Sequence, residues 1–209
     1  MVASRLSVYN GALTELGERQ ISALTSNVES RRVLDQIWNN DFVDEILQMG
    51  QWNFAARTAL LDYDTDVTSQ FGFQRAFSKP SDWVRTMGVS ENEHFEPPLS
   101  EYADEAGYIW CDVDEIYFKW VSNDTNYGND FSKWPANFRR FAETYLARKA
   151  APRLTQDEKK MEIIDRVATR ALSIARSTDA MDDMHPRPPA GRWVRSRMGN
   201  MINRERRGS

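Results

Sequence analysis

Few side chains in this sequence could carry out catalysis or bind a metal. Its 209 residues include two histidines, His94 and His185, and one cysteine, Cys111. A structural zinc ion is usually held by four Cys or His side chains, so this inventory argues against such a site. His94 lies close to Glu93 and Glu96 in a polar segment, where flexible carboxylates and one imidazole make a poor metal site. We expect a solvated loop there and no bound metal.

Three acidic residues, Asp112, Asp114 and Glu115, could act as paired catalytic carboxylates. They lie between segments 108–111 and 116–121, which are rich in β-branched and aromatic residues. This pattern predicts a hairpin in which the acidic residues form an exposed turn. The sequence also lacks a glycine-rich phosphate loop and a dinucleotide fingerprint. We therefore expect no active site and no cofactor.

The charge of the chain is divided unevenly. From Pro186 to Ser209 there are seven arginines and one glutamate, a net charge of +6, so the first 185 residues carry −10 of the total of −4. Apolar residues, among them Trp193, Met198 and Ile202, interrupt this basic segment. Binding to phosphates needs only Lys and Arg, whereas interleaved apolar residues suit a segment that folds onto a protein groove. The pattern favours a protein partner, with a nucleic-acid arm as the alternative.

Helical periodicity marks both ends of the remaining chain. The first predicted helix covers about residues 3–16 and ends before Gly17, and a second, long helix runs from about Ser26 to Gly50. A third begins at Pro135 and ends or kinks at Pro152, and a fourth follows, with Thr155 and Glu158 at the spacing of a capping box. Ser26 and Glu29 have the spacing of a capping box for the second helix.

Between these helices the period changes to that of strands, in segments 71–77, 83–87, 108–111 and 116–121. We predict a mainly α protein with a β-rich insertion (α+β), built as a four-helix bundle core, a small antiparallel β lobe and an extended C-terminal tail. The expected organisation is a first helical half at 1–57, a β-rich lobe at 58–132, a second helical half at 133–178 and a basic tail at 179–209.

An aromatic cluster, Trp52-Asn53-Phe54, lies where helical periodicity gives way to strand periodicity. Aromatic residues are more often buried in a core than exposed for binding. We therefore predict that these three residues pack between the helical core and the β lobe.

Several segments together resemble the tail tubular protein A family, the head-to-tail adaptors of short-tailed phages. They are residues 12–18 (ALTELGE), 21–24 (ISAL), 31–34 (RRVL), 52–55 (WNFA), 80–85 (PSDWVR), 134–138 (WPANF) and 145–147 (YLA). The similarity covers about residues 6–175 and consists of packing residues in a common order. Residues after Thr178 match no pattern of the family.

The resemblance implies a non-enzymatic virion protein of the phage neck, made in the host cytoplasm. Such adaptors form a ring of twelve copies beneath the portal protein, extend the DNA channel and provide the platform for the tail nozzle protein; tail fibres are a further candidate partner. No apolar run is long enough to cross a membrane, and no secretory signal is expected.

On this interpretation, two groups of residues are candidates for contacts with partners. The basic segment would bind the portal through Arg192, Trp193, Arg195, Arg197, Met198 and Ile202. Asp112 and Asp114 would contact a neighbouring subunit or the nozzle. Two other classes remain as alternatives: a nucleic-acid-binding packaging or regulatory factor that uses the arginine-rich tail, and a cell-wall hydrolase that uses Asp or Glu.

Overall fold

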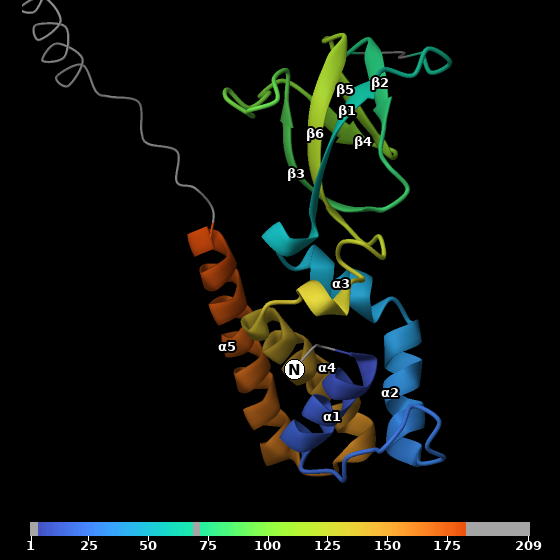
Figure 1. The fold of residues 1–209 in the computed structure, drawn as a ribbon, viewed down its shortest axis with the longest axis vertical. Helices are drawn as coiled ribbons and strands as arrows, with labels where there is room; N and C mark the ends of the chain where they lie inside the picture. Colours follow the sequence, from blue (N-terminus) through green and yellow to red (C-terminus); the bar gives the residue numbers. More distant parts are fainter. Residues whose placement is uncertain (1–3, 69–71, 183–209) are drawn as a thin grey trace, which may run out of the picture.

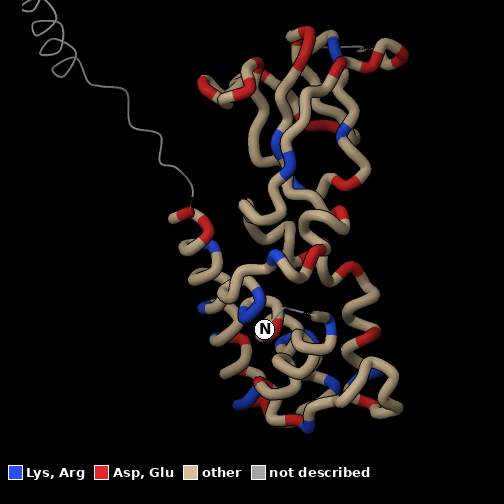
Figure 2. The backbone as a smooth tube through the Cα atoms, in the orientation of Figure 1, with Lys and Arg blue, Asp and Glu red and all other residues tan. Residues whose placement is uncertain are grey.

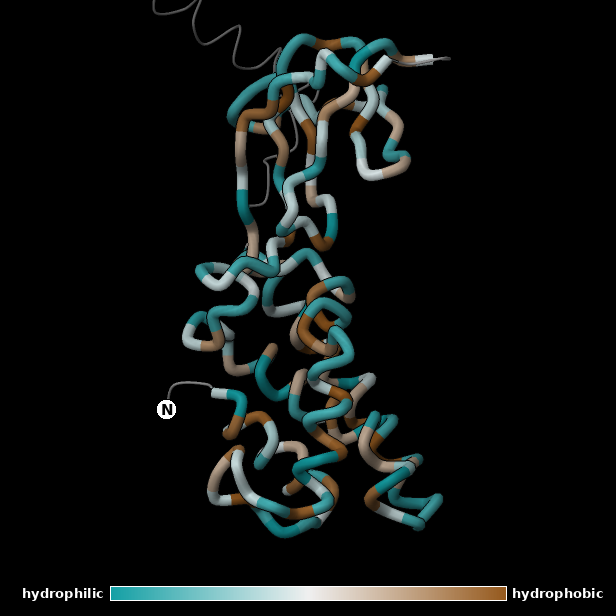
Figure 3. The backbone as a smooth tube through the Cα atoms, turned by 90° about the vertical axis from the view of Figure 1, so that its right-hand side faces the viewer, coloured by the Kyte–Doolittle hydropathy of each residue, from teal (hydrophilic) through white to brown (hydrophobic). Residues whose placement is uncertain are grey.

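The structure, a computed structural model, describes residues 4–68 and 72–182. Helices and strands lie at opposite ends of an elongated molecule (Figure 1), and a view turned by 90° shows the same division (Figure 3). The helices are α1 (Arg5–Leu16), α2 (Glu29–Asn39), α3 (Phe42–Gln48), α4 (Ala136–Leu154) and α5 (Glu158–Asp182). The strands are β1 (Ala56–Asp62), β2 (Arg75–Ser78), β3 (Trp83–Ser90), β4 (Ala103–Glu105), β5 (Tyr108–Cys111) and β6 (Glu115–Ser122). Two 3-10 helices, η1 (Asn53–Ala55) and η2 (Phe131–Lys133), lie where the chain passes between the two ends.

Helix α4 is the centre of the helical end, and α1, α2 and α5 pack against it rather than mainly against one another. Its composition explains this position, because buried residues occur on every side of the helix. They are Phe138, Phe141, Ala142, Thr144, Tyr145, Leu146, Ala147, Ala150 and Ala151. Helix α5 contributes mainly small side chains to the shared core, among them Ala168, Ala171 and Ala175, which allow the two helices to approach closely.

The predicted four-helix bundle is wrong. The described residues form five helices and two three-stranded antiparallel sheets. The long helix expected between Ser26 and Gly50 is interrupted, because Asp41 adopts φ 56°, a left-handed conformation that an α-helix cannot contain. Helix α3 therefore changes direction and contacts β3. The helices instead pack around a central α4, with few contacts between α1 and α2 or between α1 and α5, unlike the neighbouring helices of a four-helix bundle.

Helix ends differ in part from the predicted ones. Gly17 has φ 65° and caps α1 in the left-handed conformation, as predicted. The capping box predicted for α2 is wrong, because Val28 is the N-cap residue and no side chain caps this end. At α5 the cap is Asp157, whose Oδ1 accepts a hydrogen bond from the Lys159 N–H at 3.0 Å. Pro152 lies inside α4, which continues for two more residues. No helix in the described ranges combines the length and the apolar character needed to cross a bilayer.

The strand end consists of two small sheets, ordered β1-β6-β3 and β2-β5-β4, with every pair antiparallel. One buried cluster contains side chains from both sheets: Phe77, Val89, Ile109, Cys111, Ile116, Phe118 and Trp120. Strand β6 alternates as this arrangement requires, because Ile116, Phe118 and Trp120 are buried while Tyr117 and Lys119 are partly exposed. The strand end therefore has a core of its own between two facing sheets.

The hairpin predicted from segments 108–111 and 116–121 is also wrong. Strand β5 pairs with β2 and β4, whereas β6 pairs with β1 and β3. Asp112, Val113 and Asp114 thus connect one sheet to the other. This connection lets Ile109 and Ile116 enter the same core from facing sheets, which a flat hairpin would not do.

Candidate functional site: the junction between helices and strands

The aromatic cluster at the junction is centred on Trp52, which is 1% exposed. Its ring meets Phe138 of α4 edge to face, with centroids 4.7 Å apart, and the Phe54 ring also lies 4.7 Å from the Phe138 ring. The indole N–H donates a hydrogen bond of 3.2 Å to the carbonyl of Ile46 in α3. Trp52 therefore packs against α4 and is hydrogen-bonded to α3, directly before the chain enters β1.

Gly50 is required by this packing. A Cβ atom at position 50 would lie 2.6 Å from the Trp52 ring, closer than a methyl group and an aromatic carbon can approach. The chain therefore turns back tightly after α3 and places the indole beneath its own backbone. A side chain here would force Trp52 out of its position against Phe138 and α4.

Polar contacts connect the junction to the far end of the sequence. The backbone N–H of Asn53 donates to the carboxylate of Asp179, 3.1 Å from Oδ1, and the Asn53 side-chain amide donates to the Asp179 carbonyl at 3.1 Å. Asp179 lies in the last turn of α5, 126 residues away in sequence. These bonds hold the end of α5 against η1, at the entrance to the strand end.

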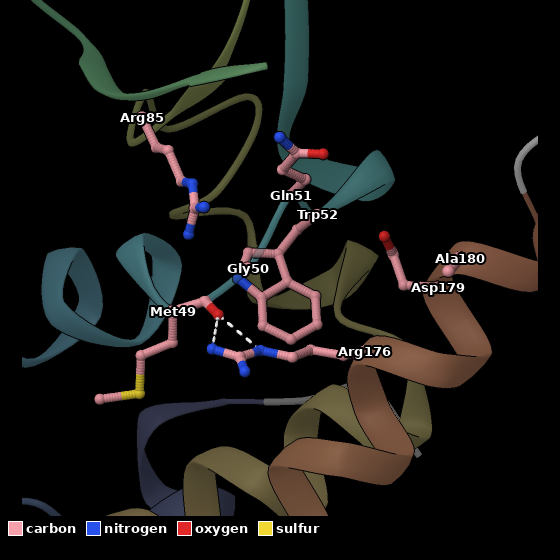
Figure 4. A pocket seen from close by; sticks show the side chains of 8 residues that line it. All are labelled: Met49, Gly50, Gln51, Trp52, Arg85, Arg176, Asp179 and Ala180. Atoms are coloured by element: carbon pink, nitrogen blue, oxygen red, sulfur yellow. Dashed lines mark hydrogen bonds between the residues drawn. The ribbon is translucent and has the colours of Figure 1, made fainter.

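A pocket of about 460 Å³ lies beside the cluster (Figure 4). Arg85 from β3 and Arg176 from α5 approach the C-terminal end of α3 from opposite sides. Arg85 Nη1 donates to the Gln48 carbonyl at 2.8 Å, and Arg176 Nε donates to the Met49 carbonyl at 2.7 Å. The last carbonyls of a helix lack partners within the helix and carry partial negative charge, so both cations stabilise this end. The pocket is thus a meeting point of three elements that are distant in sequence.

A second polar cluster fixes β3 against β1 and β6. Asp82 Oδ2 accepts hydrogen bonds from Arg57 Nη1 at 2.9 Å and from the Ser122 hydroxyl at 2.5 Å. Burial acts to raise the pKa of Asp82, but these hydrogen bonds and the charge of Arg57 outweigh it and lower the pKa. The carboxylate therefore stays ionised and links the starts of β1 and β3 to the end of β6.

The candidate carboxylates of the β5–β6 connection each bind a residue at the start of β2. Asp112 Oδ1 accepts a hydrogen bond from the Gln74 N–H at 2.9 Å, which fixes the loop before β2. Asp114 forms an ion pair of 2.6 Å with Arg75, and its side chain is 81% exposed. Both lie on the strand end at an accessible surface, and their contact with another protein stays a prediction.

The remaining candidates do not assemble into a chemical site. His94 is exposed and lies 3.5 Å from Glu93. Within residues 4–68 and 72–182, no three His, Cys, Asp or Glu side chains are grouped in a metal-binding arrangement. Cys111 is buried in the inter-sheet core, and burial raises the pKa of its thiol. The predicted portal-binding residues all lie outside the described residues; they are Arg192, Trp193, Arg195, Arg197, Met198 and Ile202.

Sequence reasoning identified the aromatic part of the junction but missed its polar part. Arg176 and Asp179 lie in a helix whose pattern indicates only packing, and Asn53 belongs to the predicted aromatic cluster. Asp82 and Arg85 belong to segment 80–85, which carries part of the family resemblance. No local signal pairs residues more than a hundred positions apart.

No protein-family model matches this chain, and a search of curated proteins found no match either.

Proposed function

We propose that this protein is a structural head-to-tail adaptor of a phage virion. Copies of the chain would form a ring, of twelve by the family resemblance, beneath the portal protein. The ring would extend the DNA channel and provide the attachment platform for the tail nozzle protein, with tail fibres as a further candidate partner. On this proposal the protein acts by positioning other proteins in the neck of the virion and not by catalysis.

The observation that carries this proposal is the division of the molecule into two ends that differ in architecture and charge. Residues 56–122 contain 13 acidic and five basic residues, a net charge of −8. Figure 2 places most of these acidic positions in the loops farthest from the helices. Phosphate affinity comes mainly from Lys and Arg, so an acidic surface along a channel would let DNA pass without binding it. This charge distribution supports a conduit more than a DNA-binding role.

The junction supports the same role. Trp52, the two arginines at the end of α3 and the Asn53–Asp179 contacts fix one end of the molecule relative to the other. An adaptor must hold its two binding surfaces at a constant distance and angle, because its partners are themselves symmetric assemblies. A packed and hydrogen-bonded junction provides this.

A nucleic-acid-binding factor is the second candidate, favoured by the seven arginines that follow Pro186. Its binding to duplex DNA would weaken steeply as salt is increased, because each phosphate contact releases counterions.

Negative-stain electron microscopy of the purified protein, with and without the portal protein of the same phage, tests the proposal. We expect rings that stack on one face of the portal. A parallel reaction with a chain that ends at Asp182, which keeps Asp179 and all of α5, should lose co-sedimentation with portal rings. Salt-dependent binding to duplex DNA with no binding to portal would refute the adaptor proposal.

A further inference from the structure

The solvent side of the helical end carries two adjacent pockets that meet at Arg140. One, of about 370 Å³, lies between α4 and α5 and includes Arg170 and Ile174. The other, of about 550 Å³, lies between α1 and α4 and includes Gly11 and Glu143. Because both include Arg140, the two pockets lie next to each other across three helices, and we call the surface that they form the α1–α4–α5 groove.

Helix α5 carries an exposed apolar stripe, of which Val167 and Ile174 line this groove, separate from the buried side chains that pack on α4. Ile163, Ile174 and Met181 are 57%, 46% and 75% exposed. With Val167 and Arg170 they recur at intervals of four, three, four and seven residues. This is the spacing of the side chains that meet another helix in a coiled coil. A long helix thus presents a second packing surface to solvent.

Two opposite charges of this surface have no ion-pair partner among the residues that the structure describes. The Glu143 side chain lies on the backbone of α1, since a Cβ at Gly11 would be 2.4 Å from its Cδ atom. Burial raises the pKa of this carboxyl, and only the charges of two neighbouring arginines oppose the rise. Arg170 is exposed and makes no ion pair within the described part of the chain. An unpaired carboxylate and an unpaired guanidinium therefore occupy one groove.

We propose that this surface joins one copy of the chain to the next. The exposed stripe of α5 in one copy packs into the α1–α4 part of the groove of its neighbour, and Arg170 pairs with Glu143 across the contact. The inference rests on the proposed ring, for which it supplies the contact between subunits. Two different patches of each copy are used, so the contact repeats from copy to copy and closes into a ring when the rotation between copies divides a full turn.

The charges of the groove favour a second copy over other occupants. Its lining contains two arginines, Arg140 and Arg170, and two glutamates, Glu15 and Glu143. A surface that is neutral overall does not attract phosphates, nor the arginine-rich segment after Pro186. The two unpaired charges instead favour another copy of the same chain, because Arg170 of one copy can pair with Glu143 of the next.

The size of the contact predicts how strong it is. From Ile163 to Met181 the stripe is about 27 Å long at ~1.5 Å per residue. A helix ~10 Å wide that is buried over half its circumference along this length loses about 400 Å² of surface, roughly half of what each partner buries in a stable interface. We therefore expect association that depends on concentration and is strengthened when the ring closes.

Light scattering coupled to size-exclusion chromatography tests the contact in the full-length protein. The wild-type mass should rise with concentration between about 5 and 200 μM, the range that separates weak from stable association. Arg170→Glu, Glu143→Arg and Ile174→Glu should each reduce the association constant at least about tenfold, as expected for a lost charge pair or a polar group in an apolar contact. Val28→Glu is the matched control, because Val28 is 42% exposed at the start of α2, away from the groove. It should leave association unchanged.

Exchanging the two charges between positions 170 and 143 shows whether the pairing of these two residues, rather than the net charge of the protein, controls association. An equimolar mixture of the Arg170→Glu and Glu143→Arg proteins should associate although neither does alone, and the double variant should recover association with itself. Assembly beyond a dimer in the mixture supports the repeating contact, and a species that stops at two copies refutes it.

Two further outcomes overturn the inference: a wild-type protein that stays monomeric over the whole range, or single variants that associate as the wild type does. If the single variants associate as the wild type does, rings on portal would still form, and the adaptor proposal would stand with a different contact between subunits. Association through this groove without any binding to portal would refute the adaptor proposal and leave the inference intact.

Discussion

Replacing Trp52 by alanine is the most direct test of the junction. Trp52 is 1% exposed, its ring contacts Phe138 and Phe141, and its N–H binds the Ile46 carbonyl at 3.2 Å. Truncation of a buried aromatic side chain to alanine costs about 3–5 kcal/mol, which includes the cavity that is left. The Ile46 carbonyl also loses the indole donor, although it keeps a bond of 3.3 Å from the Met49 N–H, so we expect a cost of about 4–5 kcal/mol.

Thermal unfolding followed by circular dichroism measures this cost. A loss of 1 kcal/mol lowers the melting temperature of a protein of this size by about 2–4 °C, so Trp52→Ala should melt roughly 10–20 °C below the wild type. Trp52→Phe keeps most of the ring packing but removes the N–H donor. It should cost only ~1–2 kcal/mol.

Trp110→Ala provides a matched control, because Trp110 is partly exposed in β5 and lies outside both buried clusters. Its loss should cost clearly less than the loss of Trp52. If Trp52→Ala folded with a loss below ~2 kcal/mol, or if both alanine variants were equally destabilised, the central role given to Trp52 would be wrong.

Three further perturbations test the charged groups. Burial raises the pKa of Glu143 above its usual 4.5, so the folded state favours the protonated form of this carboxyl. The free energy of unfolding therefore decreases as the pH rises through the folded pKa. Glu143→Gln should raise the melting temperature at pH 7 and leave it unchanged near pH 3. The pKa of Asp82 is lowered below 3.8, so its contribution is present above that pH and is lost as the pH falls through the folded pKa. Asp82→Asn should lower the melting temperature at pH 7 and have little effect near pH 2, and an effect independent of pH would exclude the ion pair with Arg57 as its cause. Arg176→Met removes the guanidinium donors from the Met49 carbonyl. It should lower the melting temperature by about 2–4 °C, as expected for one exposed hydrogen bond to a helix end. An unchanged melting temperature would show that Arg176 does not stabilise the C-terminal end of α3.

Periodicity was sufficient for the parts of the fold that are set by neighbouring residues. The apolar stripes of α1, α4 and α5 and the end of α1 at Gly17 follow from spacings within one helix. The interruption at Asp41 was missed for a physical reason. Leu34, Trp38, Phe42 and Ile46 keep a spacing of four residues across the break, so the apolar pattern continues although the backbone does not.

Strand pairing could not be predicted because it depends on residues that are distant in sequence. Segments 108–111 and 116–121 look like two arms of a hairpin, since a three-residue polar connection separates β5 from β6. Placing them in different sheets allows Ile109 and Phe118 to pack across one core, and this gain in buried apolar surface decides the topology. The pattern of residues within one segment contains no information about which sheet that segment joins.

The candidate site shows the same limit. Trp52 could be recognised as buried and Phe54 as packed against the core, because a pair of aromatic residues at a change of periodicity usually packs inside the protein. The polar contacts at the junction could not, since Asn53 and Asp179 are 126 residues apart. Both are common surface residues, and only the folded chain brings them together.

If the subunit contact lies on the helical end, the junction also determines where the strand ends lie in the ring. Neighbouring copies in a twelve-fold ring differ in orientation by about 30°, and contacts confined to the helices would set this angle. The strand ends would then be positioned only through the junction, because each chain enters β1 and leaves β6 next to it. A few degrees of freedom there would displace the acidic loops, which lie at the far end of an elongated molecule. Burying Trp52 and binding the end of α3 with two arginines removes that freedom, so the residues that stabilise the fold would also set the width of the channel.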